Sequence, residues 1–342
     1  MGRIEERICY TYEDLTIKPS EVSDIEHRIE CVPWDKEGYL PIFTAPMDTV
    51  VNEANYDMFE MNKIHAILPR IEQYPIDVRI EYSTSGKWAA FSLVEFEQYF
   101  CTEDKTIFKG KPMKVLIDIA NGHMRKLFDV AKKAKSIWGD NLILMGGNIA
   151  NEETYRQYAE SGFDYVRVGI GGGKGCLSTS NVGVHKPMAS LINDTYFVKK
   201  RLESQGVYDK LPYIIADGGI RGYRDVIKAY SLGADYVMIG SVFAKMEESA
   251  APKEEKDGEL YATFYGMASR EGQIAMNGEK TKTSEGVKKL LKVEYTMKGW
   301  ITNFTDYLRS AMSYIGAETI DVLKEVAVLV VNSQNATNVV NK

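Results

Sequence analysis

Short apolar segments alternate with longer segments of helical periodicity along the chain. Each short segment is rich in β-branched, aromatic or other apolar residues and ends near Gly, Asp, Asn or Ser, a pattern that predicts a buried strand. Eight such strands are predicted, at residues 41–46, 64–68, 88–94, 114–118, 142–146, 164–169, 213–217 and 235–240.

The segments between these strands predict crossover helices. GHMRKLFDVAKKAKSIWG, NEETYRQYAESG and GYRDVIKAYSLG carry an apolar residue at every third or fourth position, and each ends in Gly. Alternating strands and helices give parallel strands, and eight such units predict an α/β fold, a (β/α)8 TIM barrel that occupies residues 1–342 as a single domain. An open, doubly wound parallel sheet is the alternative.

Two connections are too long to be a single helix. GIGGGKGCLSTSNVGVHKP follows the strand at 164–169 and is too rich in Gly and Ser to be helical. A second long extension follows the last strand, and its residues 257–292 are predicted to form a mobile flap. Because loops that follow barrel strands lie at the catalytic face, both segments should overlie the same mouth.

The ends of the last two strands are candidates for binding a phosphate. ADGGIRG and MIGSVF place small residues where backbone N–H groups can approach an anion, which makes Gly219, Gly240 and Ser241 candidate phosphate ligands. Lys174 adds a positive charge in a third Gly-rich segment. Asp217 ends its strand and can accept hydrogen bonds from ribose hydroxyls. Turns selected only for their tightness are the alternative.

Cys176 is a candidate nucleophile. It follows five glycines and precedes LSTSN, so no apolar burial protects it, and a nearby phosphate site would favour its thiolate. Cys9, Cys31 and Cys101 are scattered without metal-type spacing and are expected to be inert apolar residues. In the flap, Glu285 is a candidate acid or base, although a solvated polar segment is the alternative.

Composition narrows the classes of partner. The chain has 342 residues of which 44% are hydrophobic, enough for one large core, and a formal charge of -6 that argues against nucleic acid as the main partner. No apolar run approaches the ~18 residues of a membrane helix, and the charged N-terminus lacks the apolar region of a secretory signal. We therefore expect a cytoplasmic protein without a membrane partner.

Taken together, the motifs resemble those of a known family. PMDTV, DIANGH, GGNIA, VGIGGGKGC, IIADGGIRG and VMIGSVFA occur in this order, and the chain is similar to the IMP dehydrogenase and GMP reductase family from about residue 8 to 320. DIANGH and the flap segment KTKTSEGVKK look more like GMP reductases. The lack of an inserted regulatory (CBS-type) domain also resembles GMP reductases.

The resemblance implies an enzyme that reductively deaminates GMP to IMP and ammonia with NADPH. The Cys176 thiolate would attack C2 of the purine and form a covalent thioimidate, while Ser178 and Glu285 would assist the departure of ammonia. IMP dehydrogenase, which oxidises IMP to XMP with NAD, is the alternative within the family. A purine-nucleotide-binding sensor barrel with decayed chemistry is the alternative of another class.

The resemblance also assigns roles to further residues and implies a homotetramer. The base would contact Met47, Met238, Gly266 and Met267. Asp118, Ala120, Asn121, Arg70 and Lys282 would serve the cofactor, and the backbone carbonyls of Gly171, Gly173 and Cys176 would hold a monovalent cation such as K+.

Several positions depart from the family pattern. Gly172 replaces the usual proline of the cysteine loop, and Leu177 and Thr179 replace Thr and Arg after the cysteine. Pro69 replaces a His or Lys, and Thr281 replaces a Tyr in the flap. These changes imply an altered substrate, such as a deoxynucleotide or a modified guanine nucleotide.

Overall fold

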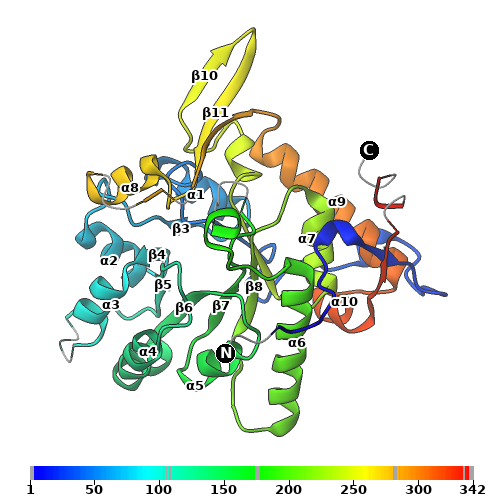
Figure 1. Cartoon of the computed structure of the whole chain (residues 1–342), viewed down its shortest axis with the longest axis horizontal. Coiled ribbons are helices and arrows are strands. Elements are labelled where there is room, and N and C mark those ends of the chain that lie inside the picture. The colour runs from blue at the N-terminus through cyan, green and yellow to red at the C-terminus, as the bar shows by residue number, and fades with distance from the viewer. Residues whose placement is uncertain are drawn as a thin grey trace.

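Eight parallel strands form the central sheet of the computed structural model, in the order β2-β9-β8-β7-β6-β5-β4-β3 (Figure 1). The two ends of the sheet meet because Phe43 in β2 pairs with His65, just before β3, with Thr44 N–H donating to the His65 carbonyl at 2.9 Å. This closure makes the sheet a barrel and excludes the open-sheet alternative. All eight predicted strands and the (β/α)8 fold are confirmed.

The bounds of the elements follow the predicted alternation. The barrel strands are β2 (Ile42–Thr44), β3 (Ile67–Leu68), β4 (Trp88–Phe91), β5 (Met113–Ile117), β6 (Leu142–Ile149), β7 (Tyr165–Val168), β8 (Tyr213–Asp217) and β9 (Tyr236–Ile239). The helices are α1 (Glu53–Met61), α2 (Ile76–Thr84), α3 (Leu93–Phe100), α4 (Arg125–Trp138), α5 (Thr154–Glu160), α6 (Met188–Gln205), α7 (Tyr223–Ser231), α8 (Arg270–Asn277), α9 (Met297–Ile315) and α10 (Ile320–Val326). Outside the barrel lie β1 (Leu15–Lys18), β10 (Lys253–Lys256), β11 (Glu259–Tyr265), β12 (Lys288–Lys292) and β13 (Val328–Val331).

The structure describes residues 4–102, 104, 106–107, 109–173, 178–279, 283–284, 286–333 and 336–338, with the side chain of Ser178 excepted. No helix in this part of the chain is both long enough and apolar enough to span a bilayer.

Side chains fill the inside of the barrel. Phe43 contacts Trp88 and Tyr165 edge to face, with ring centroids 5.7 Å apart in both pairs, and Tyr236 packs at 5.5 Å from Tyr165. The barrel interior is therefore a packed core, as expected for eight strands. A second core lies between the strands and the helices, where the apolar stripe of α4 buries Leu127, Ala131 and Ala134.

Some elements differ from the predicted ones. The strand predicted at 88–94 ends at Phe91 because Ser92 begins α3, its hydroxyl accepting a hydrogen bond from Glu95 N–H at 3.2 Å. In the cysteine loop, predicted to have no helix, residues Ser178–Val182 form a single π-helical turn, η4. The β1–β13 pair was not predicted.

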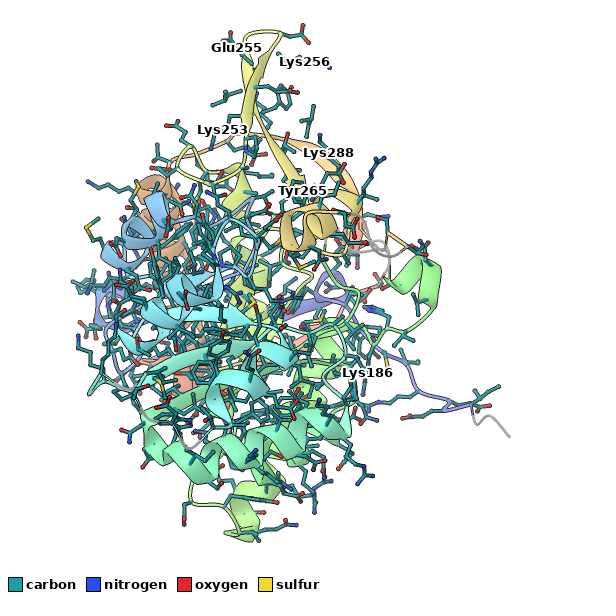
Figure 2. All side chains as sticks on the ribbon, turned by 90° about the vertical axis from the view of Figure 1, so that its left-hand side faces the viewer. Lys186, Lys253, Glu255, Lys256, Tyr265 and Lys288 are labelled. Atoms are coloured by element: carbon teal, nitrogen blue, oxygen red, sulfur yellow. The ribbon has the colours of Figure 1, made fainter. Side chains whose placement is uncertain are left out.

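The segment predicted as the flap has its own secondary structure. It contains β11, α8 and β12, and β10, β11 and β12 form an antiparallel three-stranded sheet. The β10–β11 hairpin projects from the barrel, with Glu255 and Lys256 near its tip (Figures 1 and 2). Ala262 and Phe264 are buried at alternate positions of β11, so only the lower part of the hairpin packs against the barrel.

Candidate active site

A cavity of about 230 Å³ opens at the carboxyl ends of the barrel strands. Ten residues singled out from the sequence line it together: Met47, Asp118, Gly173, Asp217, Gly219, Met238, Gly240, Ser241, Gly266 and Met267. They come from five barrel strands or the loops that follow them (β2, β5, β7, β8 and β9) and from the segment directly after β11. The remaining lining residues are Ala45, Pro46, Arg167, Gly218, Ile220, Phe264 and Ala268.

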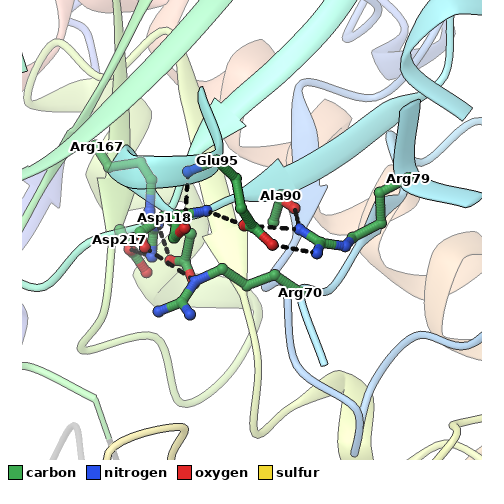
Figure 3. Close-up of polar contacts among 8 residues, drawn as sticks. Arg70, Arg79, Ala90, Glu95, Asp118, Arg167 and Asp217 are labelled. Carbon is green, nitrogen blue, oxygen red and sulfur yellow. Dashed lines mark hydrogen bonds and ion pairs between the residues drawn. The ribbon is translucent and has the colours of Figure 1, made fainter. Parts of the chain in front are cut away.

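Arg167, on β7, is the buried cation of this cavity. Its Nη1 donates to Asp118 Oδ1 at 2.9 Å, and its Nε donates to Asp217 Oδ2 at 2.9 Å (Figure 3). Burial disfavours the charged guanidinium, but the carboxylates of Asp217 and Asp118 outweigh burial and raise the pKa of Arg167.

Only one carboxylate oxygen of Asp217 accepts hydrogen bonds from described residues. Its Oδ2 accepts hydrogen bonds from Arg167 and from Asn148 Nδ2, the latter at 2.7 Å. No described residue donates a hydrogen bond to Oδ1. Gly169 makes this packing possible: its φ is +137°, and a methyl group there would overlap the Asp217 carbonyl oxygen.

Asp118 is held by two arginines. Besides its bond from Arg167, it accepts hydrogen bonds from Arg70 Nε at its Oδ2 (3.2 Å) and at its backbone carbonyl (3.1 Å). Burial disfavours its charge, but Arg70 and Arg167 outweigh burial and lower the pKa of Asp118. Asp118 is therefore a carboxylate, and Arg70, predicted to serve a cofactor, contacts it directly.

The two Gly-rich segments after β7 and β8 are joined. Gly219 N–H donates to the Gly172 carbonyl at 2.8 Å, so the predicted phosphate turn contacts the start of the cysteine loop. Gly240 and Ser241 form the neighbouring part of the cavity wall, and the Gly240 carbonyl accepts a hydrogen bond from Ala244 N–H at 3.0 Å. Backbone groups and small residues thus dominate this side of the cavity.

In the loop after β5, Asp118 lines the cavity but Ala120 and Asn121 do not. Ala120 and Asn121 are exposed, and Asn121 Oδ1 accepts a hydrogen bond from His123 N–H at 3.1 Å. Ala150 N–H donates to His123 Nε2 at 3.1 Å, so the imidazole proton lies on Nδ1, facing Thr154 Oγ1 at 3.0 Å. Burial lowers the pKa of His123, which fits a neutral ring.

Gly171, predicted to hold a cation through its carbonyl, lies outside this cavity. Its carbonyl accepts a hydrogen bond from the Thr179 hydroxyl at 3.1 Å. Both residues line a separate hollow of about 240 Å³ beside the N-terminal segment. Among the described residues, no group of three or more His, Cys, Asp or Glu side chains could hold a metal ion.

Several predicted residues lie outside the described residues: Lys174, Cys176, Leu177, Thr281, Lys282 and Glu285. The backbone of Ser178 begins η4, but its side chain is also outside them. Gly173, the last described residue before Lys174, lines the cavity.

A second ion pair, between buried Arg79 and half-buried Glu95, connects two helices with β4. Arg79 of α2 pairs with Glu95 of α3 at 2.5 Å and also donates to the Ala90 carbonyl at 3.0 Å (Figure 3). Burial opposes the charge of Glu95, but hydrogen bonds from Arg79 and from Ser92 N–H outweigh it and lower the pKa of Glu95 to about 2. This pair fixes α2 and α3 to β4.

Sequence reasoning missed Arg167, Asn148, Asp48 and Tyr265. A signal was present for Arg167, because it is the single charged residue in the otherwise uncharged strand YVRV. The Asp48–Tyr265 contact joins residues 217 positions apart, which no local pattern indicates.

Comparisons with known proteins point to one family. Residues 98–339 match the model of the IMP dehydrogenase / GMP reductase domain. The chain is 30% identical to the GMP reductase of Bacillus licheniformis over 95% of this chain and 96% of that relative. It is 29% identical to the GMP reductases of Staphylococcus carnosus and Bacillus subtilis, over 95% of this chain and 97% and 96% of those relatives.

Proposed function

The chain belongs to the IMP dehydrogenase / GMP reductase family of oxidoreductases, and from that premise we propose that it converts GMP, or a related guanine nucleotide, to IMP and ammonia with NADPH. The observation that carries the proposal is that one cavity at the barrel mouth brings these candidate residues together. It collects Asp217 for the ribose, Gly219, Gly240 and Ser241 for the phosphate, and Met47, Met238, Gly266 and Met267 for the base.

The chain's own residues supply the nucleophile and the proton donors of the proposed reaction. The Cys176 thiolate adds to C2 of the purine, and the exocyclic nitrogen leaves as ammonia after protonation, which gives a thioimidate. Ser178 and Glu285 deliver that proton. Lys174 lies two positions before Cys176 and adds positive charge near the phosphate.

The second half of the reaction needs a hydride at the same carbon. NADPH supplies that hydride when bound, the C2–S bond breaks with its electron pair returning to sulfur, and IMP is released. The surroundings of Asp118 fit a nicotinamide, because the carboxylate lies in the cavity wall and the exposed loop with Ala120 and Asn121 adjoins it. Arg70 orients Asp118, and Lys282 would contact the cofactor from the flap.

A monovalent cation and a homotetramer complete the proposal. Backbone carbonyls of Gly171, Gly173 and Cys176 are oxygen donors of the kind that K+ prefers. Assembly is supported by apolar side chains exposed on the outside of the barrel, among them Phe197 (62% exposed) and Val328 (55% exposed). We propose that the enzyme acts in the cytoplasm.

Two assays test the function. Purified protein mixed with GMP and NADPH should lower the absorbance of the reduced nicotinamide, while IMP and NAD should raise it if the dehydrogenase direction dominates. Turnover in the second assay alone would overturn the reductase assignment. Binding of GMP without turnover in either assay would identify a sensor barrel.

Mass spectrometry tests the covalent step. Protein denatured during turnover of GMP should carry a nucleotide adduct on the peptide that contains Cys176. An adduct on another peptide, or none in an enzyme that turns over GMP, would remove the thioimidate from the mechanism.

A further inference from the structure

Tyr265 and Asp48 join two walls of the cavity. The Tyr265 hydroxyl donates a hydrogen bond to Asp48 Oδ2. Asp48 directly follows Met47 in the loop after β2, and Tyr265 ends β11 directly before Gly266 and Met267. Figure 2 shows Tyr265 at the base of the projecting hairpin, beside α8. Each partner is thus the sequence neighbour of residues that line the cavity.

Asp48 has few other ways to satisfy its carboxyl group. Its Oδ1 is buried and has no hydrogen-bond partner among the described residues. Burial raises the pKa of Asp48, and the hydrogen bond from Tyr265 acts against that rise. Loss of the Tyr265 hydroxyl would leave a buried carboxyl group without its principal donor, which is costly enough to move the loop.

The backbone at Gly266 and Met267 is fixed from its other side by α8. Ser269 N–H donates to the Gly266 carbonyl at 2.8 Å. Gly272 of α8 packs so closely that a methyl group there would lie 2.6 Å from Met267 Cα. This segment is therefore a rigid unit, and Tyr265 connects the unit to the loop that carries Met47.

We propose that Asp48 and Tyr265 are positioning residues for the purine, setting the distance between Met47 on one wall and the Gly266–Met267 backbone on the other. The inference rests on the proposed function, since it assigns the base to these two walls. Neither side chain lines the cavity, so the pair acts through its neighbours.

The test compares GMP binding by calorimetry with turnover. Tyr265→Phe keeps the ring and removes the hydroxyl, and it should raise the Kd for GMP by about tenfold, the usual weight of one hydrogen bond to a charged group. It should raise KM by a similar factor and change kcat much less. Asp48→Leu should have the same effect, whereas Asp48→Asn keeps an acceptor and should restore binding to near the wild-type value.

Tyr155→Phe is the matched control, because it removes a buried hydroxyl that donates to the Pro212 carbonyl at 2.5 Å, away from the cavity. It should leave the Kd for GMP unchanged. An unchanged Kd in Tyr265→Phe, or an equal rise in Tyr155→Phe, would overturn the positioning role while the proposed function stands. Failure of the wild-type protein to bind GMP would instead overturn the proposed function.

Discussion

Arg167 Nε lies 2.9 Å from Asp217 Oδ2, and the same guanidinium continues to Asp118. One buried cation thereby connects the proposed ribose ligand with the carboxylate proposed to face the cofactor. Asn148 donates a second hydrogen bond to Asp217 Oδ2, and Arg70 donates to Asp118 Oδ2, so both carboxylates are held by residues of the barrel.

Replacing Arg167 should damage stability and activity together. Arg167→Met leaves two buried carboxylates with too few positive partners, and we expect a loss of about 3–5 kcal/mol in the free energy of unfolding. Arg201→Met is the control, since its pair with Glu153 is exposed and should contribute below about 0.5 kcal/mol. Urea unfolding measures both, and equal losses would contradict a buried role for Arg167.

Asp217→Asn should remove discrimination at the ribose. In the wild-type enzyme, the Asp217 carboxylate should favour GMP over its 2′-deoxy or 3′-deoxy analogue by about tenfold in KM, because it accepts a hydrogen bond from the missing hydroxyl. In Asp217→Asn the ratio should fall toward one. A ratio equal to that of the wild-type enzyme would show that another group binds the ribose hydroxyls.

Cys176→Ser should separate binding from turnover. A serine hydroxyl is not ionised at neutral pH, so turnover should fall by several orders of magnitude while calorimetry still detects GMP binding. Cys9→Ser replaces a half-buried cysteine of the N-terminal segment and should behave as wild type. Turnover of Cys176→Ser within about tenfold of wild type would exclude sulfur as the nucleophile.

The lowered pKa of Glu95 should make the free energy of unfolding depend on pH in the acid range. Its pKa falls from 4.5 to about 2 on folding, so its contribution is complete above pH 4.5 and is lost as the pH falls from 4.5 toward 2. Glu95→Gln should cost about 3 kcal/mol at pH 7, and the difference from wild type should shrink over that range.

The control for Glu95 lies on the same helix. Glu97 pairs with Lys126 at the surface, where 44% of the Glu97 side chain is exposed, so Glu97→Gln should cost less than about 0.5 kcal/mol at any pH. Thermal unfolding at several pH values compares the two variants. A constant difference between Glu95→Gln and wild type across the range would contradict the assignment.

The barrel could be predicted because its signals are local. A buried parallel strand such as that ending at Asp217 is a short apolar run closed by a polar residue, and each crossover helix carries its own apolar stripe. Eight such strand–helix units are the number that closes a TIM barrel. Because the strands are parallel, their carboxyl ends all lie at the same mouth. That is why ten candidate residues from distant segments line one cavity.

The contacts within the cavity could not be predicted in the same way. The contacts of Arg167 with Asp118 and Asp217 span 49 and 50 positions, and the partner of Asp48 lies on a hairpin that has no helical or barrel periodicity. Such pairings depend on how the elements meet in space. The π-helical turn at Ser178–Val182 was not predicted for a related reason, since its sequence STSNV has no apolar periodicity and Ser, Thr and Asn have low helix propensity.

The hydrogen bond from Gly219 N–H to the Gly172 carbonyl limits how an anion can enter. The Gly219 N–H already donates to the Gly172 carbonyl. A nucleotide phosphate must therefore either bind to neighbouring amides or replace that carbonyl as the acceptor of the Gly219 N–H. In the second case the Gly172 carbonyl, four positions before the proposed nucleophile Cys176, would lose this hydrogen-bond donor. Because glycine restricts its own backbone least of all residues, binding of the proposed phosphate would then be coupled to the conformation of the loop that carries Cys176.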